Sequence, residues 1–360
     1  HAASIGNLQL GELANNVANG VDTYTLLQPL GVCAGITPFN FPAMIPLWMF
    51  PMAIATGNTF VLKPSEQDPM VTTRLIELAI EAGVPAGVLS LVHGGESVVN
   101  ALCDHPQIKA VSFVGSTRVG THVYQRASLS GKRVQCMMGA KNHAIVMPDA
   151  HREQTLNQLV GAAFGAAGQR CMALSVVVLV GQAQTWLDDL VAKAQTLKVS
   201  AGHVAGTDVG PVISCAAKAR VEGLIAQGIA EGATVVAGGL GKPAGLDKGY
   251  YVKPTVFANV TSEMTIAKEE IFGPVLSILG YESVEQAIDI GNDTEYGLAA
   301  YVQAADLNEA RKIASKLRAG QVSINGGGGD MMAPFGGYKM SGNGREWGDY
   351  GFQDRKSTRL

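Results

Sequence analysis

The chain has 360 residues, of which 47% are hydrophobic and 16% are charged, and its formal net charge at pH 7 is −3. This weakly acidic balance without a basic stripe argues against nucleic acid as a partner. The low charge density and the 44 glycines are typical of a large α/β enzyme with buried parallel strands. The length predicts roughly two domains.

The cysteines do not predict a disulfide framework, because their number is odd and no two are spaced as Cys-x-x-Cys. We therefore expect a reducing compartment such as the bacterial cytoplasm. The segment Cys103-Asp104-His105 has no second pair of ligands nearby, so we expect no metal site. The five cysteines are Cys33, Cys103, Cys136, Cys171 and Cys215.

A long uncharged run lies between Asp22 and Lys63. Pro42, Pro46 and Pro51 interrupt it, which favours a buried β-α-β segment over a membrane span. We expect no membrane partner. No secretory signal is visible, and because the chain begins with histidine we expect that its natural start lies upstream.

In chain order, residues 1–27 predict a short helix and then a β-rich edge strand at 21–27 without an obvious partner. Strands and helices alternate from residue 31 onward, which predicts a Rossmann-like, doubly wound parallel sheet. Such a sheet binds ligands at the carboxyl ends of its strands. The expected strands are 31–36, 59–63, 88–92 and 110–114, and the expected helices are 43–56, 69–82 and 97–103.

A second α/β block begins near Met138, and its first helix, expected over 152–167, leads to Cys171. A glycine-rich loop spans 238–249. The further expected strands are 144–147, 175–180, 234–237, 275–279, 298–303 and 321–325, and the further helices are 185–197, 216–232, 284–290 and 307–317.

Three stretches carry residues suited to chemistry. Seven of the twelve residues in Val160–Cys171 are glycine or alanine, which leaves the thiol accessible to a flat ligand; Cys171 is either a nucleophile or an inert buried thiol. Lys63 and Glu66 follow a strand and can bind ribose hydroxyls, or they form an ordinary charged loop. Gly115–Gly120 can present backbone N–H groups to phosphate, or it is a glycine turn with a capping hydroxyl.

Six separated stretches resemble aldehyde dehydrogenase signatures, occur in the order typical of that family, and cover nearly the whole chain. The resemblance implies an NAD-binding domain at 28–138, a catalytic domain at 139–341, a remnant of an N-terminal helix and oligomerisation strand at 1–27, and a C-terminal oligomerisation segment at 342–360. The six stretches are Pro38–Pro42, Leu62–Glu66, Phe113–Thr117, Gly168–Cys171, Glu269–Pro274, and Pro334–Lys339 with Ser341-Gly342.

The resemblance also implies residue roles. Cys171 would attack the aldehyde carbon as a thiolate, and Asn40 would donate its side-chain amide to the resulting oxyanion. Lys63, Ser65 and Glu66 would lie at the adenosine ribose. The other residues implied to contact NAD are Ile36, Thr37, Pro38, Phe39, Gly115, Ser116, Glu270 and Phe272.

One position departs from the hydrolytic members of the family. Met137 stands where those members carry the glutamate that activates water, and a thioether cannot take a proton. Residues 21–230 most resemble the methylmalonate-semialdehyde dehydrogenase branch, which releases its acyl group to coenzyme A. The resemblance therefore implies CoA as co-substrate, with Glu66 or Glu270 as a less favoured base for hydrolysis.

The last third of the chain, represented by Asn325–Asp330 and Tyr338–Gly351, resembles hydrolytic aldehyde dehydrogenases instead. The alternatives are therefore a hydrolytic enzyme and an inactive NAD-binding fragment. Relative to the family, we expect the chain to lack early cofactor-domain elements and the first arm of the oligomerisation hairpin, and its polar tail 353–360 makes the terminal strand doubtful. The resemblance implies a homo-oligomer, whereas a chain with these gaps should expose sheet edges and aggregate. Arg118 and Arg170 are the candidates for binding a substrate carboxylate.

Overall fold

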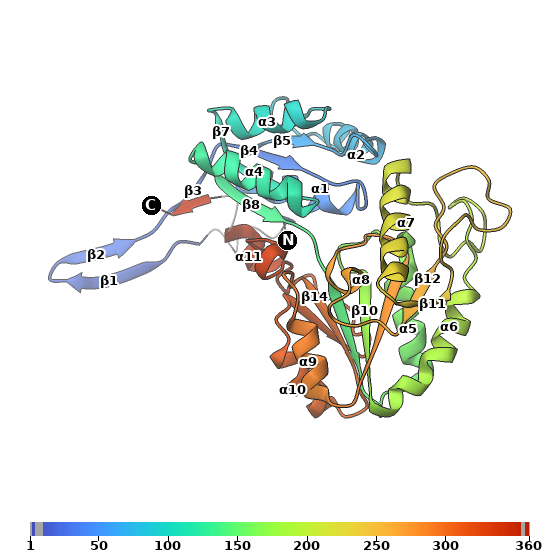
Figure 1. The fold of residues 1–360 in the computed structure, drawn as a ribbon. Coiled ribbons are helices and arrows are strands. Elements are labelled where there is room, and N and C mark those ends of the chain that lie inside the picture. Colours follow the sequence, from blue (N-terminus) through green and yellow to red (C-terminus); the bar gives the residue numbers. More distant parts are fainter. Residues whose placement is uncertain (1, 4–9, 354–356, 360) are drawn as a thin grey trace. The chain divides into compact units, whose positions relative to one another are not determined.

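The computed structural model describes residues 2–3, 10–353 and 357–359. It divides into two compact units. The first unit comprises residues 1–138, 330–336 and 342–360, and the second comprises residues 139–329 and 337–341. In Figure 1 the first unit contains the blue to green elements up to β8, together with α11.

The first unit is built on a five-stranded parallel sheet with the order β6-β5-β4-β7-β8. The chain moves outward from β4 through β5 to β6 and then returns to β7 on the other side of β4. This reversal creates a switch point at the carboxyl ends of β4 and β7, where such folds bind ligands. The strands are β4 (Val32–Ile36), β5 (Thr59–Lys63), β6 (Leu89–Leu91), β7 (Ile108–Val114) and β8 (Arg133–Met137).

Helices cover both faces of this sheet. Ala34 and Ile36 of β4 share one buried cluster with Leu102 of α3 and Val123 of α4. Gly35 points to the other face, where a Cβ atom would lie 2.9 Å from the sulfur of Met49 in α1. Alternation along one strand thus fixes which helices pack on which side. The helices are α1 (Met44–Ala55), α2 (Met70–Glu81), α3 (Glu96–Asp104) and α4 (Thr117–Leu129).

The uncharged run 23–62 forms β3 (Leu27–Pro29), β4, α1 and most of β5, as the sequence predicts. Within the described part of the chain, no helix combines the length and the apolar character needed to cross a membrane.

The N-terminal segment corrects two expectations. Residues Leu13–Ala18 form a strand, β1, which pairs antiparallel with β2 (Val21–Tyr24) through a turn at Gly20 with φ +74°. The edge strand therefore has a partner, and the expected loss of one arm of this hairpin is wrong. Any helix within residues 4–9 lies outside the described residues. Figure 1 shows the hairpin projecting from the rest of the first unit.

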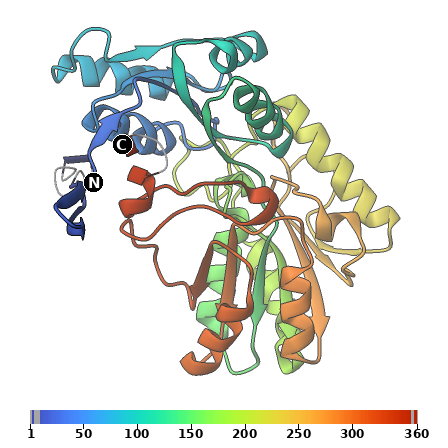
Figure 2. The same ribbon diagram turned by 90° about the vertical axis from the view of Figure 1, so that its left-hand side faces the viewer.

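The terminal strand that the polar tail made doubtful is present. Residues Ser357–Arg359 form β16, which pairs antiparallel with β3. Figure 2 shows the C-terminal end beside the blue strands of the first unit. Backbone hydrogen bonds do not require apolar side chains, which is why composition alone missed this pairing.

The second unit contains a seven-stranded sheet with the order β11-β12-β13-β10-β9-β14-β15, in which β11 alone runs antiparallel to its neighbour. Both sheets confirm the α/β class. The sequence analysis predicts no element at β8 or β12, so it missed both strands. The strands are β9 (Asn142–Val146), β10 (Leu174–Val180), β11 (Thr234–Ala237), β12 (Thr255–Ala258), β13 (Val275–Tyr281), β14 (Ala299–Gln303) and β15 (Gln321–Ile324).

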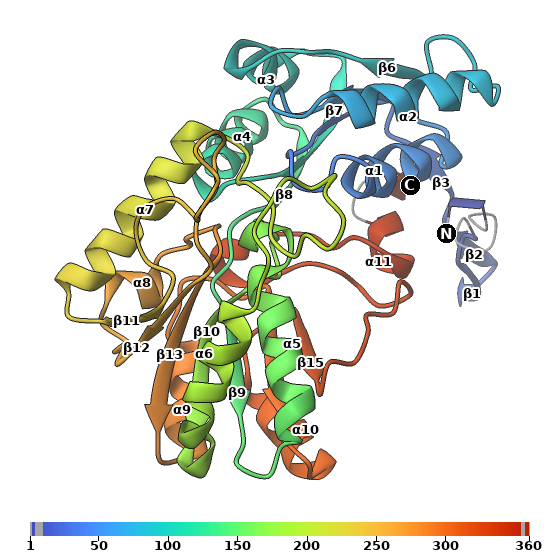
Figure 3. The same cartoon turned by 90° about the vertical axis from the view of Figure 1, so that its right-hand side faces the viewer.

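Helices α5 and α6 cover one face of this sheet, and α9 and α10 cover the other (Figures 1 and 3). The helix expected over 185–197 begins as a 3₁₀ turn at Gly181–Trp186. The bounds are α5 (Arg152–Phe164), α6 (Leu187–Gln195), α7 (Cys215–Ala230), α8 (Thr265–Lys268), α9 (Val284–Asn292) and α10 (Leu307–Lys316).

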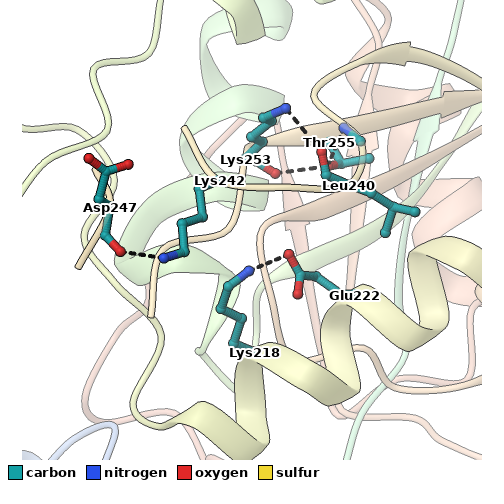
Figure 4. Close-up of polar contacts among 8 residues, drawn as sticks. Lys218, Glu222, Leu240, Lys242, Asp247, Lys253 and Thr255 are labelled. Carbon is teal, nitrogen blue, oxygen red and sulfur yellow. Dashed lines mark hydrogen bonds and ion pairs between the residues drawn. The ribbon is translucent and has the colours of Figure 1, made fainter. Parts of the chain in front are cut away.

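The glycine-rich loop between β11 and β12 is held by its own polar contacts (Figure 4). Lys253 Nζ donates to the carbonyl of Leu240 at 3.0 Å, and Lys242 Nζ donates to the carbonyl of Asp247. The nearby ion pair of Lys218 with Glu222 lies within α7. Lys218, Lys242 and Lys253 therefore each bind a neighbouring group in this region.

Candidate active site

The turn that carries Cys171 is conformationally unusual. The helix expected to continue to residue 167 ends at Phe164, because Ala166 and Ala167 adopt left-handed backbone angles, with φ of 52° and 54°. Gly168 follows with φ of 70°. Each left-handed alanine costs roughly 1–2 kcal/mol, so surrounding contacts must hold the turn. Strain of this kind concentrates at functional sites.

Close backbone approach explains the glycine at the centre of this turn. A Cβ atom at Gly168 would lie 2.0 Å from the carbonyl oxygen of Gly273. The backbone before Cys171 therefore packs directly on the segment that follows Glu270. Only glycine permits this contact together with a positive φ.

Asn142, at the start of β9, anchors the thiol-bearing turn from the other side. Its Nδ2 donates to the carbonyls of Cys171 at 2.9 Å and Ala173 at 2.8 Å, while its Oδ1 accepts from the backbone N–H of Ala299 at 3.1 Å. The side chain is 2% exposed, so these bonds form away from water. Tyr301 of β14 adds a hydroxyl that donates to the carbonyl of Met172.

Cys171 is half-buried and lines a pocket at the amino ends of β9, β10 and β13. Cys33, Cys103 and Cys136 are buried, and Cys215 is exposed. Burial raises the pKa of Cys171 to about 11; the backbone N–H of Met172 opposes this rise, and the nearby Glu270 adds to it. The resting group is therefore a thiol, and the proton must leave before it can attack a carbonyl.

Glu270 and Phe272 line the same pocket as Cys171. The Oε1 atom of Glu270 accepts from the backbone N–H of Ala140 at 3.0 Å. Burial raises the pKa of Glu270, whereas that hydrogen bond and the charges of Arg220 and Lys141 lower it. The structure thus brings together three of the predicted residues within the second unit.

The carboxylate candidates have other contacts. Arg170 lines the pocket, but its Nη2 donates to the carbonyls of Gly161 and Ala162 at the end of α5, at 2.7 and 2.8 Å. The guanidinium thus helps to terminate α5. Arg118 lies on α4 of the first unit and is exposed.

In the first unit, the predicted cofactor residues follow the carboxyl ends of three neighbouring strands. Ile36 ends β4, with Thr37, Pro38 and Phe39 after it; Ser65 follows β5, and Gly115 and Ser116 follow β7. Asn40 is half-buried in the bend before α1. Lys63 ends β5 and is 4% exposed, and its Nζ pairs with Glu66 Oε2 at 2.8 Å.

The start of α4 suits a phosphate. Ser116 occupies the N-cap position and is exposed, and its side chain makes no capping hydrogen bond. The N–H groups of a helix N-terminus carry partial positive charge. Met137, at the end of β8, is 4% exposed.

Sequence reasoning missed Asn142, Lys141 and Tyr301 as parts of this site. Asn142 and Lys141 lie in Met138–His143, which indicated only which branch of the family the chain resembles. Tyr301 gave no signal beyond its place in a strand. Their importance comes from partners far away in sequence.

Compared with known proteins, the chain matches one family over almost its whole length. The model of the aldehyde dehydrogenase family matches residues 1–359, and the chain belongs to this family.

Among curated proteins, a probable methylmalonate-semialdehyde/malonate-semialdehyde dehydrogenase [acylating], mitochondrial, of Drosophila pseudoobscura pseudoobscura is 56% identical over 327 residues, which is 90% of this chain and 63% of that protein. The corresponding rat protein is 53% identical over 326 residues, 90% of this chain and 61% of its own. The chain thus spans less than two thirds of the length of these curated relatives.

Among solved structures, a putative methylmalonate-semialdehyde dehydrogenase from Sinorhizobium meliloti 1021 complexed with NAD superposes with a TM-score of 0.95 at 42% identity, covering 100% of this chain and 75% of that one. Betaine aldehyde dehydrogenase from Staphylococcus aureus, in complex with NAD+, has a TM-score of 0.95 at 34% identity, covering 99% of this chain and 72% of that one.

Proposed function

We propose that this chain oxidises a short semialdehyde through a thioester on Cys171, with NAD as hydride acceptor and CoA as acyl acceptor. Methylmalonate and malonate semialdehydes, which would give propanoyl- and acetyl-CoA, are the proposed substrates. The observation that carries the proposal is the pocket-lining thiol, whose backbone Asn142 holds in a defined position. The names of the relatives described above support the substrate class.

In the first step of the proposed reaction, Cys171 attacks the aldehyde. Once the thiol has lost its proton, its sulfur bonds to the aldehyde carbon and the carbonyl oxygen takes the negative charge. The family resemblance gives Asn40 the role of donating its amide to that oxygen, together with the backbone N–H of Cys171. One such donor is worth about 3 kcal/mol of transition-state stabilisation.

The geometry of the first unit, taken by itself, is suited to binding NAD. Three predicted contact groups follow neighbouring strands at a switch point, and the carboxylate of Glu66 is 58% exposed. Lys63 and Glu66 would hold the adenosine ribose, and the negative charge of Glu66 would repel the 2′-phosphate of NADP. Ser116 and Gly115 would face the pyrophosphate, and Glu270 the nicotinamide ribose. When bound, NAD would supply a hydride acceptor for the attacked carbon, and a thioester would remain on Cys171.

The identity of the acyl acceptor follows from which side chains can act as a base. Met137 cannot accept a proton. The bond from Lys63 keeps the pKa of Glu66 low although burial raises it, so this carboxylate is a weak base. Burial raises the pKa of Glu270, but the proposal assigns this carboxylate to the nicotinamide ribose, and its Oε1 already accepts from the Ala140 N–H. Water is therefore poorly activated, and the thiol of CoA, a stronger nucleophile, would take the acyl group and release Cys171.

The test is NADH formation from malonate semialdehyde, methylmalonate semialdehyde and propanal, each with and without CoA. We expect steady-state turnover on the semialdehydes to need CoA and to vanish in Cys171→Ala. Cys215→Ala is the matched control, because that thiol is exposed at the start of α7 and should be dispensable.

Other outcomes favour the alternatives. Turnover that does not depend on CoA and releases the free acid supports a hydrolytic aldehyde dehydrogenase, the type that the last third of the chain resembles. If NAD binds but no aldehyde is oxidised with or without CoA, the chain is an inactive NAD-binding fragment.

The hairpin β1–β2 supports a homo-oligomer as the working form. Leu13, Val17, Val21 and Tyr24 on it are all exposed, and a second copy could cover them. The free cysteines fit a reducing compartment.

A further inference from the structure

The segment Ile266–Gly273, here named the Glu270 segment, brings two pocket residues to the site with little regular structure of its own. It begins in the single-turn helix α8 and ends just before β13. Phe272 within it has a positive φ of 51°. Such a segment needs contacts from elsewhere to keep the Glu270 carboxylate in one place.

Two cationic side chains from separate elements supply these contacts. Lys141, just before β9, donates from Nζ to the carbonyls of Ile266 at 2.8 Å and Glu269 at 2.7 Å. Arg220, on α7, donates from Nη1 to the carbonyl of Ile271 at 2.6 Å and from Nη2 to the carbonyl of Glu270. Four carbonyls within six residues thus face two cations.

The carboxylate itself is fixed by a third contact from the same direction as Lys141. Ala140, its chain neighbour, donates its N–H to Glu270 Oε1 at 3.0 Å. Lys141 and Ala140 therefore hold the segment from the β9 side, while Arg220 holds it from α7. Hydrogen bonds from charged donors are about twice as strong as those between neutral groups.

Lys141 and Arg220 differ in how they can be probed. Lys141 is 3% exposed, and burial lowers its pKa to about 7, with Glu270 and Glu269 opposing the shift. Removing it would leave an internal gap and unpaired carbonyls. Arg220 is exposed, and its bond to the Glu270 carbonyl lies at the surface, although its bond to Ile271 is partly buried, so truncating it disturbs the interior less than removing Lys141. Arg220 is thus the cleaner probe.

We propose that Arg220 is a positioning residue for the reaction: by binding the carbonyls of Glu270 and Ile271, it holds the Glu270 carboxylate where the nicotinamide ribose must bind. Arg220 acts through the backbone and contacts neither cofactor nor aldehyde. The role given to Glu270 rests on the proposed function.

The variants are Arg220→Met, Arg220→Lys and Lys218→Met. Lys218 lies two residues away on α7 and pairs within the helix with Glu222 (Figure 4), so its loss removes the same charge without touching the Glu270 segment. Arg220→Met removes both donors. Arg220→Lys restores a cation that can reach one or both carbonyls.

In Arg220→Met we expect turnover to fall roughly tenfold to hundredfold, the scale of a small misplacement of reacting groups. The KM for NAD should rise, the KM for the aldehyde should not change, and a primary isotope effect with the deuterated aldehyde should grow because hydride transfer becomes limiting. Arg220→Lys should recover part of the loss. A mere loss of folded protein would lower turnover while leaving the KM for NAD and the isotope effect unchanged.

A second readout does not depend on activity. Hydrogen exchange of the backbone amides in the Glu270 segment should be faster in Arg220→Met than in Lys218→Met. Equal exchange in the two variants, or wild-type KM and isotope effect in Arg220→Met, overturns the inference and leaves the proposed function intact. Wild-type protein that neither binds NAD nor oxidises an aldehyde overturns the proposed function, and the positioning role with it.

Discussion

Asn142 is the side chain whose removal should best reveal how the nucleophile is held. It makes three hydrogen bonds to backbone groups of Cys171, Ala173 and Ala299 while 2% exposed. Each buried hydrogen bond contributes about 1 kcal/mol net. We therefore expect Asn142→Ala to lower the free energy of unfolding by about 3 kcal/mol, because two carbonyls and one N–H lose their partner.

The same variant should lose activity beyond its loss of stability. With Asn142 gone, the carbonyl of Cys171 is no longer anchored, and the strained turn at Ala166 and Ala167 can relax toward ordinary backbone angles. Urea unfolding followed by circular dichroism gives the stability change. NADH formation at a temperature where the variant is fully folded gives the catalytic change.

Asn157→Ala is the matched control. Asn157 lies on α5 of the same unit, and its side-chain bonds to Glu153 and Lys193 are exposed. Its loss should change stability by no more than about 0.5 kcal/mol. If Asn142→Ala were as stable and as active as Asn157→Ala, the reasoning that Asn142 holds the thiol-bearing turn would be refuted.

Two further predictions concern the same turn. The raised pKa of Cys171, about 11, keeps the thiol protonated. Its labelling by iodoacetamide, followed by mass mapping, should therefore accelerate about tenfold per pH unit between about pH 7 and pH 9. A plateau in that range would contradict the argument that burial raises this pKa. Gly168→Ala should abolish turnover and lower the melting temperature, since its Cβ would lie 2.0 Å from the Gly273 carbonyl oxygen at a φ of +70°. Gly161→Ala is the control: nothing lies within 4 Å of a Cβ there, and a helical alanine should add about 0.5–1 kcal/mol of stability. Similar melting temperatures for the two variants would argue against the close approach.

The sequence by itself determined the α/β class and most of the elements. The run Leu174–Val180 is almost wholly β-branched or leucine and forms the buried centre of its sheet, where both faces are covered. Asp306 caps α10 by accepting from the N–H groups of Asn308 and Glu309, a local signal that needs no tertiary partner. Cys171 and Glu270 could be named because their motifs are specific to one family.

Only the tertiary structure decided how those residues are held. The glycine and alanine run before Cys171 predicts a longer helix, yet contacts with a segment about a hundred residues later force the chain into a left-handed turn. Asn142 reaches a carbonyl 29 residues away, and Arg220 reaches one 50 residues away. Local propensity records what a residue prefers in isolation, whereas these contacts exist only after the seven-stranded sheet and the helices on it have brought distant backbone groups within hydrogen-bonding distance.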